Sequence, residues 1–106
     1  MNDSMRPRTP QIQVPMEEIF AFCSRNYIRS LALFGSVLGD DFGEDSDIDV
    51  LVEFEPGHIP GFQFFAMQDE LGEIFGRKVD LNTFGFLSPN FHAEVREKAL
   101  VYYVKP

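Results

Sequence analysis

The sequence predicts an α/β (α+β) fold, in which a small mixed sheet is flanked by helices in the order α-β-β-α-β-α. Two kinds of segment indicate this class: some carry apolar residues at helical spacing, and others alternate apolar and polar residues. Gly- or Pro-containing stretches separate them. Because 106 residues leave room for one core, we expect a loose leader over residues 1–14 and a single domain over residues 15–106.

Three segments are predicted to be helical. The first follows Pro15 and carries one apolar stripe, made of Met16, Ile19, Phe20, Cys23 and Tyr27. The second runs over residues 61–75 and ends at Gly76, a residue suited to a helix C-cap; Phe64, Phe65, Gln68, Leu71, Ile74 and Phe75 share one side of it. The third begins at Ser88-Pro89, an N-cap residue followed by a proline in the first helical position.

The extended segments lie between these helices. Residues 31–34 form a short apolar run that stops at Gly35. Residues 47–55 alternate, so that one face of this strand is apolar and the other begins with two carboxylates. Residues 78–83 alternate again, and residues 101–104 are expected to form a last extended piece.

Composition restricts the classes of partner. Nine Lys and Arg stand against seventeen Asp and Glu, a net charge of -8, which argues against extensive contact with nucleic acid. No apolar run approaches the ~20 residues that span a bilayer, and no apolar stretch follows Arg6 and Arg8 as it does in a signal peptide. We therefore expect a cytoplasmic protein. The single Cys23 excludes an internal disulfide, and neither His58 nor His92 has neighbours that suggest a metal or acid–base role.

Acidic side chains gather at the start of two predicted strands. Asp47 and Asp49 are two residues apart on a strand, so their carboxylates point the same way. Like charges side by side raise a pKa or require a cation, and carboxylate oxygens suit Mg²⁺. Asp80 lies on the next predicted strand, and three such carboxylates on one face can hold two metal ions ~4 Å apart.

A Gly-Ser pair precedes these acids at the end of the previous strand. A glycine such as Gly35 lets the backbone approach a phosphate closely, and exposed amides together with the Ser36 hydroxyl can cradle that phosphate. Each feature alone is weak, since Gly-Ser is usually a turn and Asp-x-Asp is often a solvated strand edge. Their combination indicates a site for a metal–nucleoside triphosphate.

These residues form a recognisable signature: Leu33-Phe34-Gly35-Ser36, then ten residues, then Asp47-Ile48-Asp49-Val50-Leu51-Val52. This pattern resembles that of the DNA-polymerase-β-like nucleotidyltransferase superfamily, and more closely the stand-alone minimal nucleotidyltransferases (MNT) of bacteria and archaea. The resemblance runs from about Glu17 to Val104 and includes Gly76-Arg77-Lys78-Val79-Asp80-Leu81 around the third acid.

The resemblance implies a role for each matching residue. Asp47 and Asp49 would ligate two Mg²⁺ ions, and Asp80 would complete the catalytic metal site and help to deprotonate the acceptor hydroxyl. Gly35 and Ser36 would bind the β- and γ-phosphates of ATP, and AMP would be transferred with release of pyrophosphate. Family members pair with a HEPN-domain toxin, for which the MNT protein is the antitoxin, and some transfer AMP to a tyrosine of that toxin.

One departure from the family pattern leaves alternatives open. Related chains often carry an arginine a few residues after Gly-Ser, whereas here residues 37–41 read Val-Leu-Gly-Asp-Asp. Arg77 or Lys78 is the nearest substitute in the motif. The alternatives are a non-catalytic antitoxin or assembly subunit that acts by binding, and nucleotidyl transfer to RNA or to a small molecule. The chain has no room for a second domain, and twelve Phe exceed what one small sheet buries, which indicates a partner surface.

Overall fold

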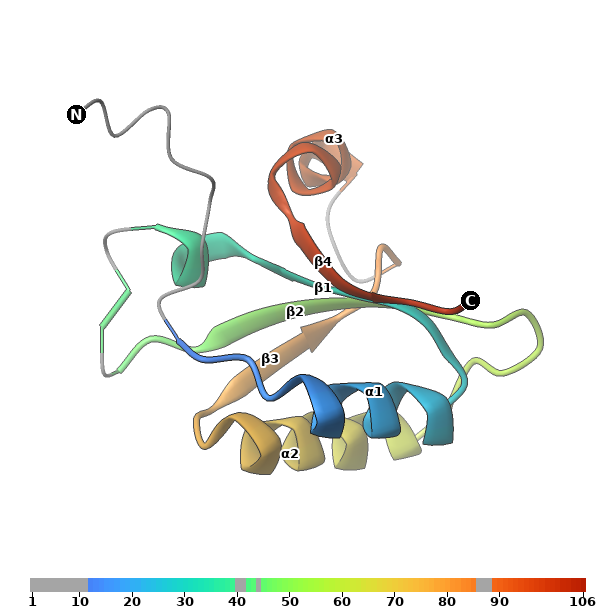
Figure 1. Ribbon diagram of the computed structural model, residues 1–106. Helices are drawn as coiled ribbons and strands as arrows, with labels where there is room; N and C mark the ends of the chain where they lie inside the picture. Colours follow the sequence, from blue (N-terminus) through green and yellow to red (C-terminus); the bar gives the residue numbers. More distant parts are fainter. Residues whose placement is uncertain (1–11, 40–41, 44, 86–88) are drawn as a thin grey trace.

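The computed structural model describes residues 12–39, 42–43, 45–85 and 89–106 (Figure 1), so residues 1–11 of the predicted leader and Ser88 lie outside the described ranges. In chain order the elements are α1 (Met16–Arg25), β1 (Ile28–Phe34), the 3₁₀ turn η2 (Gly35–Leu38), β2 (Ile48–Phe54), α2 (Gln63–Phe75), β3 (Val79–Asn82), α3 (Pro89–Lys98) and β4 (Leu100–Val104).

The four strands form one mixed sheet in the order β3-β2-β1-β4. β1 is antiparallel to both β2 and β4, whereas β2 and β3 are parallel and joined by α2. α1 and α2 lie side by side on one face of the sheet, and α3 lies on the other (Figure 1). The predicted class and order are confirmed, and the expected last extended piece is a full edge strand, β4.

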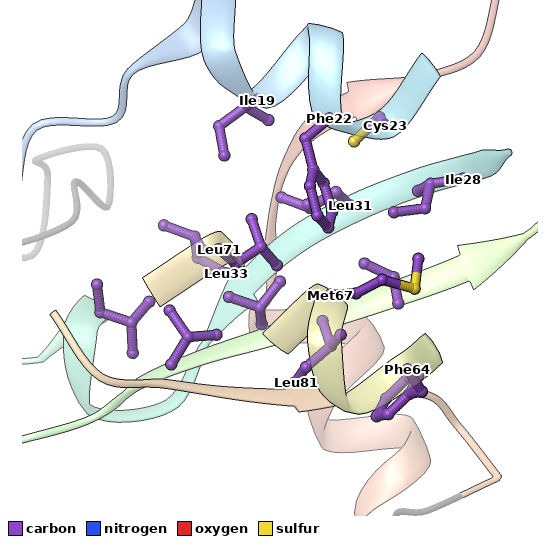
Figure 2. Close-up of a cluster of buried hydrophobic side chains, with 14 of the residues drawn as sticks. Ile19, Phe22, Cys23, Ile28, Leu31, Leu33, Phe64, Met67, Leu71 and Leu81 are labelled. Atoms are coloured by element: carbon purple, nitrogen blue, oxygen red, sulfur yellow. The ribbon is translucent and has the colours of Figure 1, made fainter. Parts of the chain in front are cut away.

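The core lies between the sheet and the α1–α2 pair (Figure 2). Alternate residues of β1 and β2 face this side, so that Leu31 pairs with Val52 and Leu33 pairs with Val50, all four fully buried or nearly so. The helices cover them with the labelled side chains Ile19, Phe22, Cys23, Phe64, Met67 and Leu71. Cys23 behaves as a small apolar residue here, since burial raises the pKa of its thiol to about 12.

Two details of the predicted helix stripes were wrong. Phe20 and Tyr27 are half exposed, and Phe22 takes the core position next to Cys23. Phe20 instead meets the ring of Tyr103 edge-on, with the ring centroids 5.5 Å apart. In α2, Phe65 is 64% exposed, while Met67 is buried. The cause is the same in both helices: a wide apolar stripe permits several rotations about the helix axis, and only packing against the sheet selects one.

The end of α2 follows the predicted cap. Gly76 adopts a left-handed conformation with φ of 69°, which a glycine accepts without strain. The amide of Arg77 donates to the carbonyl of Gly72 at 3.1 Å, so the chain turns sharply out of the helix towards β3. Beside this end of α2, Ile12 and Val14 pack half-buried against the core and line a pocket with Ile74 and Phe75, although both fall within the predicted leader.

No helix among the described residues has the length and apolarity needed to cross a bilayer. The large exposed side chains gather partly at one end of the domain, where Tyr27, Ile59 and Phe62 lie near the turn before α2. Ile59 is 83% and Phe62 92% exposed.

We predict that Leu71→Ala lowers the free energy of unfolding by about 2–5 kcal/mol, because Leu71 is fully buried and its truncation leaves a cavity. Phe62→Ala, which also removes a large apolar side chain, should change it by less than ~0.5 kcal/mol because Phe62 is exposed. Urea denaturation measures both. Equal effects of the two substitutions would contradict the assigned core.

Candidate functional site

Asp49 and Asp80 are direct neighbours across two parallel strands. The register pairs Ile48 with Val79 and Asp49 with Asp80, and the buried Ile48 and Val79 face the helices. Because successive side chains of a strand alternate, Asp49 and Asp80 both face the opposite side of the sheet, the side on which α3 lies. Asp47 lies one residue before β2 and is half-buried. The structure therefore brings the three predicted acids together.

Gly35 touches this group from the other neighbouring strand. Phe34, the last residue of β1, pairs with Asp49, so the next residue lies beside the aspartate side chain. A Cβ added to Gly35 would lie only 2.3 Å from Oδ2 of Asp49, and Gly35 also has a φ of 76°. Only glycine satisfies both conditions. Ser36 follows, exposed, in the 3₁₀ turn, directly after the glycine that lies beside Asp49.

The crowding of the three acids changes the titration of Asp49. Burial raises the pKa of Asp49 to about 6, and the nearby charges of Asp80 and Asp47 and a side-chain hydrogen bond with Asp80 act in the same direction. A divalent cation would offset this repulsion, and oxygen donors of this kind suit Mg²⁺. Within the described part of the chain, no three acidic, His or Cys side chains form a ready set of metal ligands.

Arg77 fastens the loop that precedes Asp47. Its guanidinium donates to the carbonyl of Gly43 and, at 3.1 Å, to the carbonyl of Ser46, and it lies 4.2 Å from the centre of the Phe42 ring. Ser46 is the residue immediately before Asp47. The Ser46 hydroxyl in turn accepts from the Gly43 amide at 3.0 Å, so the loop is tied both to itself and to the start of β3.

Arg77 and Lys78, the two possible substitutes for the missing arginine, have different surroundings. Both line a cleft of about 410 Å³ together with Asp45, Ser46 and Asp47, but the Arg77 guanidinium is bonded to the loop carbonyls, whereas Lys78 is exposed. The stretch after Ser36 gives no cation: Val37 is buried, and Asp40 and Asp41 lie outside the described residues.

Three other titratable side chains have separate contacts. Glu55 forms an ion pair with Lys105 at the far end of β2. His58 stacks on Tyr27 with ring centroids 4.0 Å apart, and His92 meets the backbone carbonyl of Phe84 through Nε2 at 2.8 Å. Sequence reasoning missed the loop role of Arg77. The available signal was its position directly after the Gly76 cap, which fixes where the chain leaves α2.

Comparison with known proteins decides the family. The model of the nucleotidyltransferase domain matches residues 16–103. The chain belongs to the nucleotidyltransferase domain family. This assignment confirms the family and the enzyme class expected from the Gly-Ser and Asp-x-Asp motifs, and the match reaches from the start of α1 into β4.

Individual relatives of this nucleotidyltransferase agree. "Putative protein adenylyltransferase MJ1379" of Methanocaldococcus jannaschii is 36% identical over 76 residues, which are 71% of this chain and 76% of the relative. Two solved structures share the fold. A toxin–antitoxin complex with AMP-PNP has a TM-score of 0.70 at 18% identity, over 86% of this chain and 74% of that one. A tri-AMPylated Shewanella oneidensis HEPN toxin in complex with MNT antitoxin has a TM-score of 0.63 at 18% identity, over 85% and 70%.

We predict that Asp49→Asn stabilises the metal-free protein above about pH 6 and has little effect near pH 4. The pKa of Asp49 rises from 3.8 to about 6 on folding, so the folded state binds the proton more tightly and wild-type stability falls as pH rises through this window. The asparagine variant cannot ionise at this position, so its stability does not fall in this way. Urea denaturation in EDTA across the window measures the difference, with Asp69→Asn, an exposed carboxylate of α2, as control. A difference that does not depend on pH would contradict the crowding of the acids.

We also predict that Arg77→Ala raises the Mg²⁺ concentration needed for half-maximal nucleotide binding roughly tenfold. The loop before Asp47 loses the hydrogen bonds from Arg77 to the carbonyls of Gly43 and Ser46 that position it. Arg77→Lys should recover only part of this loss, because an ammonium lacks the planar fork that reaches two carbonyls and the Phe42 ring. Titration of Mg²⁺ at fixed ATP measures the change. Arg29→Ala, at an exposed arginine of β1, is the matched control.

Proposed function

We propose that this nucleotidyltransferase transfers AMP from Mg²⁺-bound ATP to a tyrosine hydroxyl of a HEPN-type partner toxin, and so acts as its antitoxin in the cytoplasm. The observation that carries the proposal is the contact of Gly35 with the group formed by Asp47, Asp49 and Asp80. This contact places a backbone that a phosphate can approach closely beside carboxylates that can ligate a metal ion. The relative named as a protein adenylyltransferase and the AMPylated HEPN toxin in the complex with the same fold support the acceptor.

Each residue of the site has a part in this reaction. Asp47, Asp49 and Asp80 would hold two Mg²⁺ ions, which would neutralise negative charge that develops during the transfer. Gly35 and Ser36 hold the β- and γ-phosphates, with backbone amides and the serine hydroxyl as donors. Lys78, exposed beside Asp47, adds the positive charge that the segment after Ser36 lacks.

The transfer itself is a displacement at the α-phosphorus. The acceptor oxygen forms a bond to that phosphorus, the bond to the bridging oxygen of pyrophosphate breaks, and the acceptor proton passes to the Asp80 carboxylate. Asp80 suits this step because it lies on the outer side of Asp49, on the strand farther from Gly35.

A second candidate is an antitoxin that neutralises its partner by binding alone. It is favoured by the sequence after Ser36, where Asp40 and Asp41 replace the expected cation. Transfer to RNA fits less well, because the net charge of -8 opposes contact with a polyanion.

Labelled ATP separates the two candidates. The wild-type chain, co-expressed with a HEPN-type toxin, should transfer labelled AMP to it, and Asp47→Ala with Asp49→Ala should lower the transfer at least ~10³-fold. Asp69→Ala should transfer normally. If the double variant neutralises the toxin as well as the wild type and no label moves in either, the binding-only function is correct.

A further inference from the structure

β3 is a short strand at the edge of the sheet. It covers Val79–Asn82 and pairs with β2 on one side. The amide of Ile48 in β2 donates to the carbonyl of Lys78 at 2.9 Å. Backbone groups of successive residues point to opposite sides of a strand, so those of Lys78 and Asp80 face β2 and the Leu81 amide points to the open edge. An open edge leaves such an amide without a strand partner.

Gln68 of α2 supplies a partner for this amide. Its side-chain Oε1 accepts a hydrogen bond from the Leu81 amide at 2.9 Å. Gln68 is half-buried, and its neighbours on the helix, Met67 and Leu71, are buried in the core, so the carboxamide extends from a fixed backbone. The sequence places Gln68 on the same side of the helix as the apolar Phe64 and Leu71. The bond to the edge of β3 gives a polar residue a reason to be there.

The bond acts on the residue next to Asp80. Leu81 is held twice, because its side chain is buried in the core and its amide is bonded to Gln68. Asp80 is exposed on the opposite face of the sheet, so its position depends on the backbone of β3 and on its side-chain hydrogen bond with Asp49. A displacement of ~1 Å at a reacting group can cost about a hundredfold in rate, so the placement of this backbone matters.

Asp49 has a different support. β2 lies between β1 and β3, so hydrogen bonds hold its backbone from both sides. β3 has β2 on one side and the Gln68 carboxamide on the other. Removal of the Gln68 acceptor should therefore loosen Asp80 and leave Asp49 in place.

We propose that Gln68 is a positioning residue, which holds Asp80 in place for metal binding through the amide of Leu81. The inference rests on the proposed function, in which Asp80 ligates a metal ion. Gln68 lies on the helix side of the sheet, whereas Asp80 lies on the other side. Its effect on the site therefore passes through the backbone of β3.

Two variants of position 68 separate the hydrogen bond from the rest of the side chain. Gln68→Met keeps the length of the side chain but has no oxygen, so the Leu81 amide should exchange with solvent at least ~10-fold faster. Gln68→Glu keeps an acceptor oxygen and should restore slow exchange. Gln63→Met makes the same change at an exposed glutamine of α2 and should leave the exchange at Leu81 unchanged. Hydrogen exchange of the full chain, followed by NMR, measures all four proteins.

Metal binding gives the second readout. Mn²⁺, which suits the same oxygen ligands as Mg²⁺, is titrated at fixed ATP and followed by electron paramagnetic resonance. In Gln68→Met the half-saturating Mn²⁺ concentration should rise roughly tenfold, the effect expected of one hydrogen bond, and in Gln68→Glu it should stay within about threefold of the wild type. Gln63→Met should match the wild type. Thermal unfolding checks that each variant is folded, and Gln68→Ala, which also lacks an acceptor, replaces Gln68→Met if that variant is not.

Four results would overturn the inference. If the Leu81 amide stays protected in Gln68→Met, Gln68 does not hold β3. If this amide exchanges faster but Mn²⁺ binding is unchanged, Gln68 only closes the edge of the sheet, and the proposed function stands. If Gln68→Glu fails to restore what Gln68→Met loses, the effect does not come from the acceptor oxygen. If Asp80→Asn also leaves Mn²⁺ binding unchanged, Asp80 is not a ligand, and that part of the proposed function fails together with the inference.

Discussion

The parallel pairing of β2 with β3 is the constraint on which the rest of the site depends. It puts Asp49 and Asp80 side by side on one face, although they are 31 residues apart in the chain, while their neighbours Ile48 and Val79 are buried on the other. The hydrophobic burial of alternate residues fixes the register, because a slip of one residue would place charged carboxyls in the core. The energy that packs the domain thus also holds the repelling acids together.

Two local features, one on each side, hold the aspartates in place. On the β1 side, Gly35 adopts a left-handed conformation, and the Asp49 carboxyl occupies the space that a side chain at position 35 would need. On the β3 side, the C-cap of α2 sends the chain outward at Gly76, and Arg77 then reaches back to the carbonyls of the loop before Asp47. Burial and the neighbouring charges of Asp80 and Asp47 raise the pKa of Asp49, and a divalent cation would offset the repulsion between these carboxylates.

The two faces of the sheet differ in polarity. The face under α1 and α2 is apolar and supplies the core, whereas the face towards α3 is only partly covered and carries the aspartates. Figure 1 shows α3 above β1 and β4, and Asp80 of β3 on this face is exposed.

The sequence by itself determined the class of fold, the helix and strand order up to the last strand, the Gly76 cap, and the Gly35-Ser36, Asp47, Asp49 and Asp80 candidates. Those features are local or periodic, so composition and spacing carry them. Only the tertiary structure decided that Phe22 rather than Phe20 is buried, that Gly35 touches Asp49, and that Arg77 holds a loop while Lys78 stays exposed. Each of these depends on the rotation of a helix or on contacts between distant segments, which packing selects among alternatives that the local pattern leaves equal.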